Sequence, residues 1–489
     1  MKDKFAQRAS LVKSSETREI LKVTERPEVI SFAGGLPAPE LFPVEAMNDA
    51  CRAVLNEDGA ASLQYSTTEG YVPLREAISK RMQHIGIEST VSNILITSGS
   101  QQAIDLTGRL FLNDGDVVIC ESPTYLAAIN VFKSYNATFV EVDMDEDGAA
   151  SLQYSTTEGY IPLREAISKR MQDIGIESTV SNILITSGSQ QAIDLTGRLF
   201  LNDGDVVICE SPTYLAAINV FKSYNATFVE VDMDEDGMIM EELEKKLQEN
   251  PHAKFIYTIP DFQNPTGRTL TRERRQRMIE LANAYDVLIV EDNPYGGVRF
   301  AGETLPPVKH FDTEGRVIYI STFSKIFAPG LRIGWVCADE VFIDKYVAFK
   351  QVADLHTDSF AQRVTAKYME LYDIEEHIQK IKAVYKERCT QMLSCIEEFF
   401  PENLSYSKPE GGLFIWVELP QGIDSAHIFS ECLKNNVACV PGTPFFPNGT
   451  RNNALRLNYS NMSAEQIVEG MKRMGDVLHR ELTKETTVL

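Results

Sequence analysis

The sequence predicts an α/β protein with two domains, and three observations support this prediction. The chain has 489 residues, which is too long for one ordinary hydrophobic core. Up to about residue 340, short apolar runs alternate with helical segments, a pattern typical of a mostly parallel sheet covered by helices on both faces. Beyond that point a long helical pattern precedes mixed strands and helices, which indicates a smaller α+β domain. We therefore predict an N-terminal arm over 1–45, a large domain over 46–340 and a small domain over 341–489.

An internal repeat lies within the large domain. Residues 60–148 recur as residues 149–237, with an offset of 89. Only two pairs of positions differ, namely Val72/Ile161 and His84/Asp173. The tripeptide Glu-Asp-Gly precedes and closes each unit, so the units join in a polar turn where insertions are tolerated. Solenoid repeats are shorter and usually diverge, so we interpret this repeat as a tandem duplication in which one copy is redundant.

Each unit predicts the same order of elements, which is helix, short strand, helix, strand, helix and strand. The short strand (Ile-Leu-Ile-Thr) falls at 94–97 in the first unit and at 183–186 in the second. The alternation continues downstream, where we expect helix 239–248, strand 254–259, helix 271–284, strand 287–291, strand 316–321 and strand 331–337.

One sheet has room for the strands of only one unit. The second unit is closer in sequence to the downstream strands, although the cost of closing a loop grows only with the logarithm of its length. We predict that the second unit joins the sheet. The first unit is then an appendage that exposes strand edges and apolar faces, which favours aggregation or swapping between chains.

The composition restricts the classes of partner. A net charge of −23 argues against nucleic-acid binding, because no broad basic face would neutralise phosphates. No apolar run is long enough to span a bilayer, and the N-terminus lacks the apolar region of a signal peptide. Eight cysteines without a CxxC pair favour reduced thiols in the cytoplasm. We expect a soluble cytoplasmic protein without a metal, membrane or nucleic-acid partner.

Lys325 is the most informative candidate for a catalytic residue. It lies at the predicted exit of a strand, with the hydroxyls of Thr322 and Ser324 before it and Arg332 seven residues after it. A lysine amine can condense with an aldehyde, while hydroxyls and a guanidinium hold a phosphate nearby. Taken alone, a lysine in a surface loop is the more common explanation.

Asp292 closes a predicted apolar strand. A buried carboxylate is costly unless it has a positive partner, and a protonated pyridine nitrogen would be such a partner. Capping of the following turn is an equally good explanation for Asp292 alone. Asn264, in an Asn-Pro-Thr-Gly turn, and Tyr295 could both donate to a phenolate oxygen on the same ring.

Three further features suit an anion or a flat ring. The sequence Ser-Gly-Ser-Gln-Gln stands between a strand and a helix in both units, where backbone amides form an anion site or an ordinary cap. A tyrosine after the next strand could stack on a planar cofactor, although packing is commoner. The residues are Ser187, Gly188, Ser189, Gln190 and Tyr214, with first-unit counterparts Ser98, Gly99, Ser100, Gln101 and Tyr125. Arg456 alternates with apolar residues and suits a substrate α-carboxylate, or else a structural salt bridge.

The order and spacing of these motifs resemble the fold type I, class I/II aminotransferases that depend on pyridoxal 5′-phosphate. The segments that carry the resemblance are ISFAGGLPAPELFP, LQYSTTEGYVPLREAI, ITSGSQQAIDL, FQNPTG, STFSK and ALRLNYS. The chain is most similar to the branch that contains 2-aminoadipate and kynurenine-type transaminases. The resemblance implies a large domain with a mostly parallel seven-stranded sheet, flanked by helices, and a smaller α+β domain.

The resemblance also implies roles for individual residues. Lys325 would form the Schiff base and shuttle protons, and Asp292 would pair with the pyridine nitrogen. Asn264 and Tyr295 would contact the ring oxygen, Arg332 and the Ser-Gly-Ser loop the phosphate, and Arg456 the α-carboxylate. Tyr65 or its second-unit counterpart Tyr154 would reach the phosphate of a neighbouring subunit, which implies a homodimer with shared sites. In the N-terminal arm, Gly35 lies in the substrate-covering loop and Arg18 could meet a distal carboxylate.

The implied activity is transamination between an L-amino acid and a 2-oxo acid. Glutamate and 2-oxoglutarate are one expected pair, and the other amino acid is open among aminoadipate, aromatic and aliphatic ones. Two alternatives are a cofactor-binding protein disabled by the duplication and a C–S β-lyase. A related regulator would need an added basic DNA-binding domain, and no such segment is visible in the sequence.

Overall fold

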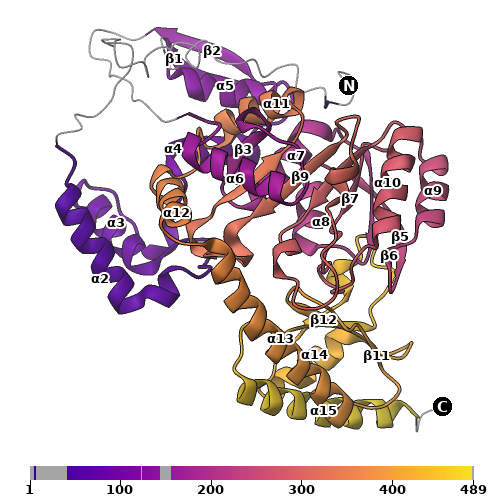
Figure 1. The fold of residues 1–489 in the computed structure, drawn as a ribbon. Coiled ribbons are helices and arrows are strands. Elements are labelled where there is room, and N and C mark those ends of the chain that lie inside the picture. The colour runs from indigo at the N-terminus through magenta and orange to yellow at the C-terminus, as the bar shows by residue number, and fades with distance from the viewer. Residues whose placement is uncertain (1–4, 7–40, 123, 144–155, 487–489) are drawn as a thin grey trace.

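The computed structural model describes residues 5–6, 41–122, 124–143 and 156–486. It contains a large sheet covered by helices and a C-terminal domain below it, with one part of the first repeat unit to the left of the sheet and another above it (Figure 1). Within the described residues, no helix is long and apolar enough to cross a membrane.

The large domain is built around one eight-stranded sheet. Its strand order is β3-β10-β9-β8-β7-β4-β5-β6. The strands are β3 (Ile183–Thr186), β4 (Val206–Ser211), β5 (Thr227–Asp234), β6 (Gly237–Met238), β7 (Phe255–Thr258), β8 (Leu288–Asp292), β9 (Val317–Thr322) and β10 (Gly334–Cys337). The ladders from β5 to β9 are parallel, whereas β10 is antiparallel to both β9 and β3. The mostly parallel sheet is confirmed, and the two-residue β6 adds an eighth strand to the seven predicted.

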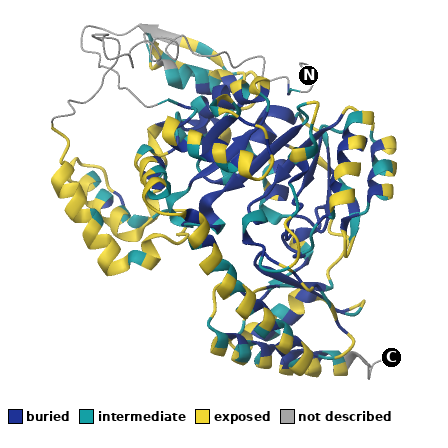
Figure 2. Cartoon of the chain, in the orientation of Figure 1, coloured by how far each residue is buried: buried dark blue, intermediate teal, exposed yellow. Residues whose placement is uncertain are grey.

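Both faces of this sheet are buried, as Figure 2 shows in dark blue. Leu184 packs with one core cluster while Ile183 and Ile185 pack with another, so successive side chains of β3 enter opposite faces. One face packs against α7 (Ser189–Phe200), α8 (Leu215–Lys222) and α11 (Glu340–Ala353). The other packs against α6 (Ile161–Asp173), α9 (Met240–Glu249), α10 (Arg272–Ala284) and α12 (Ser359–Leu371). Burial on both faces explains the continuous apolar runs of these strands.

The C-terminal domain has its own sheet and core. Its elements are α13 (Ile374–Phe399), β11 (Ser405–Tyr406), β12 (Phe414–Glu418), α14 (Ser425–Lys434), β13 (Val440–Pro441), β14 (Ala454–Asn458) and α15 (Ala464–Thr486). The four strands pair in the order β11-β12-β14-β13, and α13 packs against α15. The boundary predicted at 341 falls inside α11, whose apolar residues pack on the large sheet. The core of the small domain therefore starts further along the chain, within α13.

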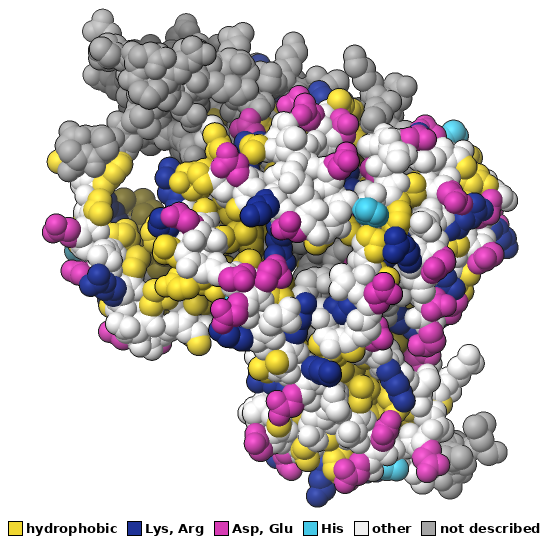
Figure 3. All heavy atoms as spheres, in the orientation of Figure 1, with side chains coloured by type: hydrophobic (Ala, Val, Ile, Leu, Met, Phe, Trp, Pro, Cys, Tyr) yellow, Lys and Arg dark blue, Asp and Glu magenta, His cyan; other side chains and the backbone are white. Residues whose placement is uncertain are grey.

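The first unit lies outside the main sheet. Helix α2 (Val44–Ser62) leads into it, and its elements are α3 (Val72–His84), α4 (Gly99–Phe111), β1 (Val117–Ser122), α5 (Leu126–Ser134) and β2 (Thr138–Asp143). Among the strands that the structure describes, β1 and β2 pair only with each other, whereas β3, β4 and β5 of the second unit occupy the main sheet, as predicted. The strand predicted at 94–97 is wrong, because β3, with the same four residues, already occupies that edge of β10. Exposed apolar side chains gather over α2 and α3 (Figure 3).

Candidate active site

Lys325 ends a short 3-10 helix, η8 (Phe323–Lys325), directly after the central strand β9. The Thr322 hydroxyl caps this turn by accepting from the Ser324 backbone N–H at 3.1 Å, and it lies 2.9 Å from the Ser324 Oγ. A lysine at this position is held at the carboxyl end of the parallel strands, the edge where α/β sheets bind ligands. A cavity of about 1350 Å³ opens beside it and is lined by Lys325, Ser324, Tyr65 and Arg456.

Asp292 lies on the neighbouring strand, where it pairs in register with Ile320 of β9. Its carboxylate is buried, and Oδ2 accepts from the Tyr257 hydroxyl at 2.8 Å. Burial raises the pKa of Asp292 to about 7, and Tyr257 and Lys325 act in the opposite direction. Oδ1 has no hydrogen-bond partner among the described residues. Since a buried polar atom without a partner is costly, this oxygen suits an incoming N–H donor.

The start of α7 forms an anion-binding cradle with Arg332. An Arg332 Nη2 donates to the Ser187 carbonyl at 3.3 Å. Gly188 has a φ of +76°, and a Cβ there would stand 2.5 Å from the same Nη2, so a side chain would fill the cradle. Ser189 begins α7 and Gln190 follows it, so backbone amides at this helix N-terminus add to the guanidinium.

Arg456 and Asn264 lie together near the ring of Tyr295. The Asn264 Oδ1 accepts from an Arg456 Nη1 at 2.9 Å, which leaves the amide nitrogen of Asn264 to donate elsewhere. The guanidinium lies 4.4 Å from the ring centre of Phe414 and 5.1 Å from that of Phe445. Burial lowers the pKa of Arg456, and its Nε has no hydrogen-bond partner among the described residues. An anion in this cavity would satisfy it.

Two tyrosines complete the surroundings of Lys325. Burial and the nearby Asp292 raise the pKa of Tyr214 to about 12. The ring of Tyr65, which belongs to the first unit, has its centre 5.2 Å from the Lys325 Nζ and 5.4 Å from the Arg332 guanidinium carbon. Burial raises the pKa of Tyr65, but Lys325, Ser324 and Arg332 outweigh it and the net pKa is lowered. The sequence predicted that this tyrosine reaches a neighbouring subunit, whereas the structure brings it to Lys325 of its own chain.

Several supporting residues were not predicted from the sequence. Tyr257 holds Asp292. Glu210 is buried and accepts from the Thr258 hydroxyl at 2.6 Å, from the Ile259 N–H at 2.9 Å and from Gln263 at 3.1 Å, which fixes the turn that carries Asn264. Behind the Ser187 loop, Asp354 accepts from Ser187, Gln191 and Lys350. Glu210 is the second-last residue of the apolar strand β4 and Asp292 is the last residue of β8, so the pattern that indicated one carboxylate would also have found the other.

Other predicted residues lie elsewhere. Arg18, Gly35 and Tyr154 fall outside the described residues. The first-unit loop, Ser98–Ser100, lies exposed at the start of α4, and the following Gln101 donates to the Val352 carbonyl instead of facing an anion site. Tyr125 is exposed and does not line the cavity beside Lys325. Only the second unit therefore supplies the loop beside Arg332.

These residues fit pyridoxal phosphate. The unpartnered Asp292 oxygen suits a pyridinium N–H and the Gly188–Arg332 cradle suits a phosphate. Lys325 is close enough to Asp292 to affect its pKa, and Lys325 and Arg332 lie near the same Tyr65 ring. When bound, this group supplies an aldehyde that condenses with amines and a ring that accepts an electron pair from the substrate carbon. The fold and the site together define a pyridoxal-phosphate-dependent transferase of fold type I.

Comparison with known proteins gives the family. The model for "Aminotransferase class I and II" matches residues 29–152 and again 145–474, and the chain belongs to this family. An aromatic-amino-acid aminotransferase of Thermococcus litoralis is 39% identical over 98% of this chain and 95% of its own. A 2-aminoadipate transaminase of Thermus thermophilus is 32% identical over 97% and 96%. A kynurenine aminotransferase of Pyrococcus horikoshii, solved with PMP, has a TM-score of 0.66 and 36% identity, with 98% of both chains covered.

The protein is an aminotransferase that uses pyridoxal phosphate. Its reaction is transamination between an amino acid and a 2-oxo acid. The double match of the family model coincides with the two repeat units, since the first match ends and the second begins close to their junction.

Proposed function

We propose that glutamate and 2-oxoglutarate are one substrate pair of this transaminase, and that Arg456 binds their α-carboxylates. The observation that carries this proposal is the unpartnered Nε of Arg456 in the cavity that also contains Lys325. A planar guanidinium with a free N–H can hold a carboxylate through two parallel hydrogen bonds. Nη1 is already fixed by Asn264, so the fork has a defined orientation before substrate arrives.

The surrounding residues would then have separate roles in binding the cofactor and in moving the proton. The Lys325 amine would remove the proton from the substrate α-carbon and return it to the carbon of the cofactor that carried the aldehyde. Asp292 keeps the proton on the pyridine nitrogen, while Asn264 and Tyr295 donate to the ring oxygen. Tyr214 covers one face of the ring. Arg332, Thr322, Ser324 and the Ser187–Gln190 segment hold the phosphate and thereby set the distance from Lys325 to the substrate.

The second amino acid substrate is aminoadipate, an aromatic amino acid or an aliphatic one. Aminoadipate and aromatic amino acids are the first substrates to test. The relatives are named for aromatic amino acids, kynurenine and 2-aminoadipate. Phe414 and Phe445 flank the Arg456 guanidinium, so the carboxylate site adjoins an aromatic wall. An aromatic side chain could pack on such a wall.

The test is a spectroscopic half-reaction. The full chain is loaded with pyridoxal phosphate, and its visible absorption is recorded before and after glutamate is added. Bleaching by glutamate and recovery with 2-oxoglutarate would support the proposal. The variant Arg456→Lys should keep the cofactor but raise the glutamate concentration needed by about tenfold or more, since a charge-assisted hydrogen bond contributes ~1.5–3 kcal/mol. Unchanged glutamate dependence in this variant would contradict the role of Arg456.

The two alternatives have different outcomes. A β-lyase would release pyruvate from cystathionine without any 2-oxo acid acceptor. A protein disabled by the duplication would stay colourless with pyridoxal phosphate, whereas the variant lacking residues 149–237 would bind it. The cytoplasmic location that the sequence suggested stays a prediction for this chain, and the homodimer with shared sites stays a prediction for a chain with one repeat unit.

A further inference from the structure

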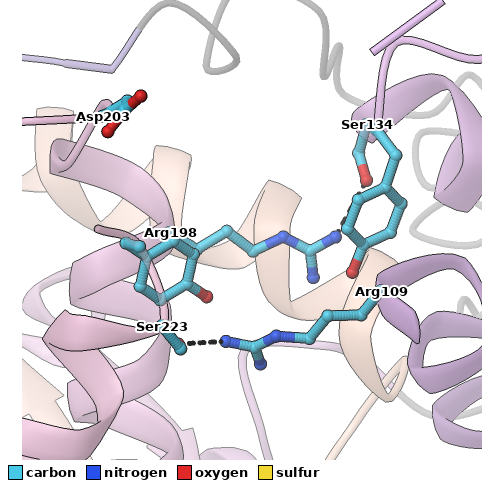
Figure 4. Close-up of a pocket in the computed structure, with 7 residues that line it drawn as sticks. Arg109, Ser134, Arg198, Asp203 and Ser223 are labelled. Atoms are coloured by element: carbon cyan, nitrogen blue, oxygen red, sulfur yellow. Dashed lines mark hydrogen bonds between the residues drawn. The ribbon is translucent and has the colours of Figure 1, made fainter. Parts of the chain in front are cut away.

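The two repeat units contact each other through the same surface. Helices α4 and α5 of the first unit face α7 and α8 of the second, and a polar cavity of about 290 Å³ lies between them. In Figure 4, Arg109 from one side and Arg198 from the other run past each other in opposite directions. Each reaches a serine of the opposite unit, with Arg109 donating to Ser223 at 2.9 Å and Arg198 to Ser134 at 2.8 Å.

Among the described residues, the arginine contacts between the two units occur in reciprocal pairs. Arg109 pairs with Asp194 at 3.0 Å, and Arg198 pairs with Asp105 at 2.9 Å. Arg109 lies 5.1 Å from the ring centre of Tyr224, and Arg198 lies 5.1 Å from that of Tyr135. When each residue is replaced by its counterpart in the other unit, 89 positions away, each contact becomes the other contact of its pair. This exchange of roles defines an isologous interface, the type that two identical subunits form across a two-fold axis.

The sequence of one helix explains why the surface complements itself. Asp194 and Arg198 stand four residues apart on α7, one turn from each other on the same side. When an identical helix lies antiparallel to it, each arginine meets the aspartate of the other helix. A face that carries both charges in this order therefore binds a copy of itself.

The first unit covers this face closely. The Arg198–Asp105 pair is buried, and Val131 of α5 is buried in the same apolar cluster as α7 and α11. Arg198 and Asp105 satisfy one another, so removal of the first unit would leave Arg198 on the second without that partner. Breaking a buried ion pair is strongly unfavourable unless water or another partner replaces the lost group.

The same unit also reaches the Lys325 site. The backbone N–H of Gly330 donates to the Leu63 carbonyl at 2.8 Å, and a Cβ on Gly330 would lie 2.8 Å from the Ser62 carbonyl oxygen. This close backbone approach places Tyr65 over Lys325 and Arg332. The first unit thus reaches both the α7–α8 face and the Lys325 site, in addition to its contact with Val352 of α11.

We propose that the first unit replaces a second subunit within the chain. It occupies the self-complementary α7–α8 face and supplies Tyr65 to the Lys325 site. A second copy of the full chain therefore cannot bind at this face. A chain with a single unit leaves the face open and pairs with another copy through it. The inference is independent of the substrate, because it concerns only the interface and the origin of one tyrosine.

The first test compares molar masses in solution by size-exclusion chromatography with light scattering. The full chain should be a monomer, and the variant lacking residues 60–148 should be a dimer. In a dimer of that shorter variant, D194R places an arginine opposite Arg198 of the other copy at two symmetric positions, and it should weaken dimerisation about tenfold or more. The charge swap D194R/R198D restores opposite charges at both positions and should restore dimerisation. A swap of the exposed pair Lys367–Glu370 is the control. A full-length dimer, or a shorter chain that folds as a monomer, would overturn the proposal.

The second test uses the full chain and does not require the deletion to fold. D194R/R198D should release the first unit and accelerate its removal by limited proteolysis about tenfold or more, because two ion pairs become two repulsions. Adding D105R/R109D restores opposite charges at both places and should restore protection. Equal rates in the original chain, the double variant and the quadruple variant would overturn the proposal.

The third test follows the tyrosine. Tyr65→Phe in the full chain should weaken binding of pyridoxal phosphate about tenfold, in line with the ~1.5–3 kcal/mol of a hydrogen bond to a charged group. Tyr154→Phe in the same chain should leave binding unchanged. Fluorescence titration with the free cofactor measures both. Loss of affinity from Tyr154→Phe but not from Tyr65→Phe would show that the first unit does not supply this residue.

Discussion

The first and second units of this chain are almost identical in sequence but differ in structure. Residues 72–143 and 161–232 differ only at two positions. The strands of the second segment belong to the main sheet, whereas the strands of the first segment do not. Phe200 is completely buried while its counterpart Phe111 is 73% exposed, and Ile208 is completely buried while Ile119 is 72% exposed. Burial is therefore decided by the partners that a segment finds, since the residues themselves are the same.

Local structure, by contrast, is the same in both units. Arg75 donates through Nε to the Ile94 carbonyl at 2.9 Å, and Arg164 donates to the Ile183 carbonyl at 3.0 Å. The parallel pair β1–β2 repeats the register of β4–β5. Structure that depends on residues close in sequence forms in both units. A strand such as β3 forms only in the unit that can pair with β10.

The largest expected difference between the units concerns the core. Phe200→Ala should cost the large domain about 3–5 kcal/mol of unfolding free energy, because the ring packs against Phe255, Phe342 and Tyr346. Phe111→Ala should change it by less than about 0.5 kcal/mol, since that ring faces solvent. Urea unfolding of the two variants measures both values. Similar losses would mean that the first unit shares in the main core.

A second comparison concerns a carboxylate that is buried in only one unit. Burial raises the pKa of Glu210 to about 7, whereas its counterpart Glu121 is exposed. The folded state then holds a proton more tightly than the unfolded state, so stability is greatest below about pH 4.5 and falls as the pH rises to about 7. Glu210→Gln should remove the part of this fall that Glu210 causes, which is at most about 3 kcal/mol at 1.36 kcal/mol per pKa unit. Glu121→Gln should leave the slope unchanged.

The midpoint of urea unfolding, measured from pH 4.5 to 8, gives these slopes. Asp292 and Glu291 also have raised pKa values, so the slope of Glu210→Gln should decrease without vanishing. A steeper slope in this variant than in the original chain would contradict the assignment to Glu210.

The two loop glycines form a third pair. Gly188 and Gly99 both have positive φ, at +76° and +73°, so an added Cβ strains both backbones alike. Only at Gly188 would the Cβ meet Arg332, since nothing lies within 4 Å at Gly99. Gly188→Ala should therefore weaken pyridoxal phosphate binding about tenfold or more, and Gly99→Ala should not. Titration with the cofactor measures the affinity of both variants. An equal loss of affinity in both would contradict the assignment of the second-unit loop to the cofactor site.

The smallest effect is expected from making the units identical. The variant I161V/D173H gives the second unit the residues of the first, and both side chains are exposed. We expect a change in stability within about 0.5 kcal/mol and unchanged cofactor binding. A larger change would mean that these two positions, rather than position along the chain, select which unit enters the sheet.

The sequence predicted the fold from patterns that depend on near neighbours. Apolar runs such as Leu288–Asp292 and Val317–Thr322 could be recognised as buried strands, and their ends located Asp292 and Lys325. The strand at 94–97 was wrong because the pattern does not reveal which copy finds a partner. The hydrogen bonds from Thr258 to Glu210 and from Ser187 to Asp354 join residues 48 and 167 positions apart, separations that periodicity does not encode.

The place of Tyr65 beside Lys325 changes the molecularity of the site. When two chains share a site, its parts separate as the protein is diluted, because assembly is a second-order process. When the parts belong to one chain, the linker holds them at an effective concentration on the order of millimolar, whatever the protein concentration. A chain with Tyr65 and Lys325 in contact therefore keeps its cofactor site assembled however dilute the protein becomes.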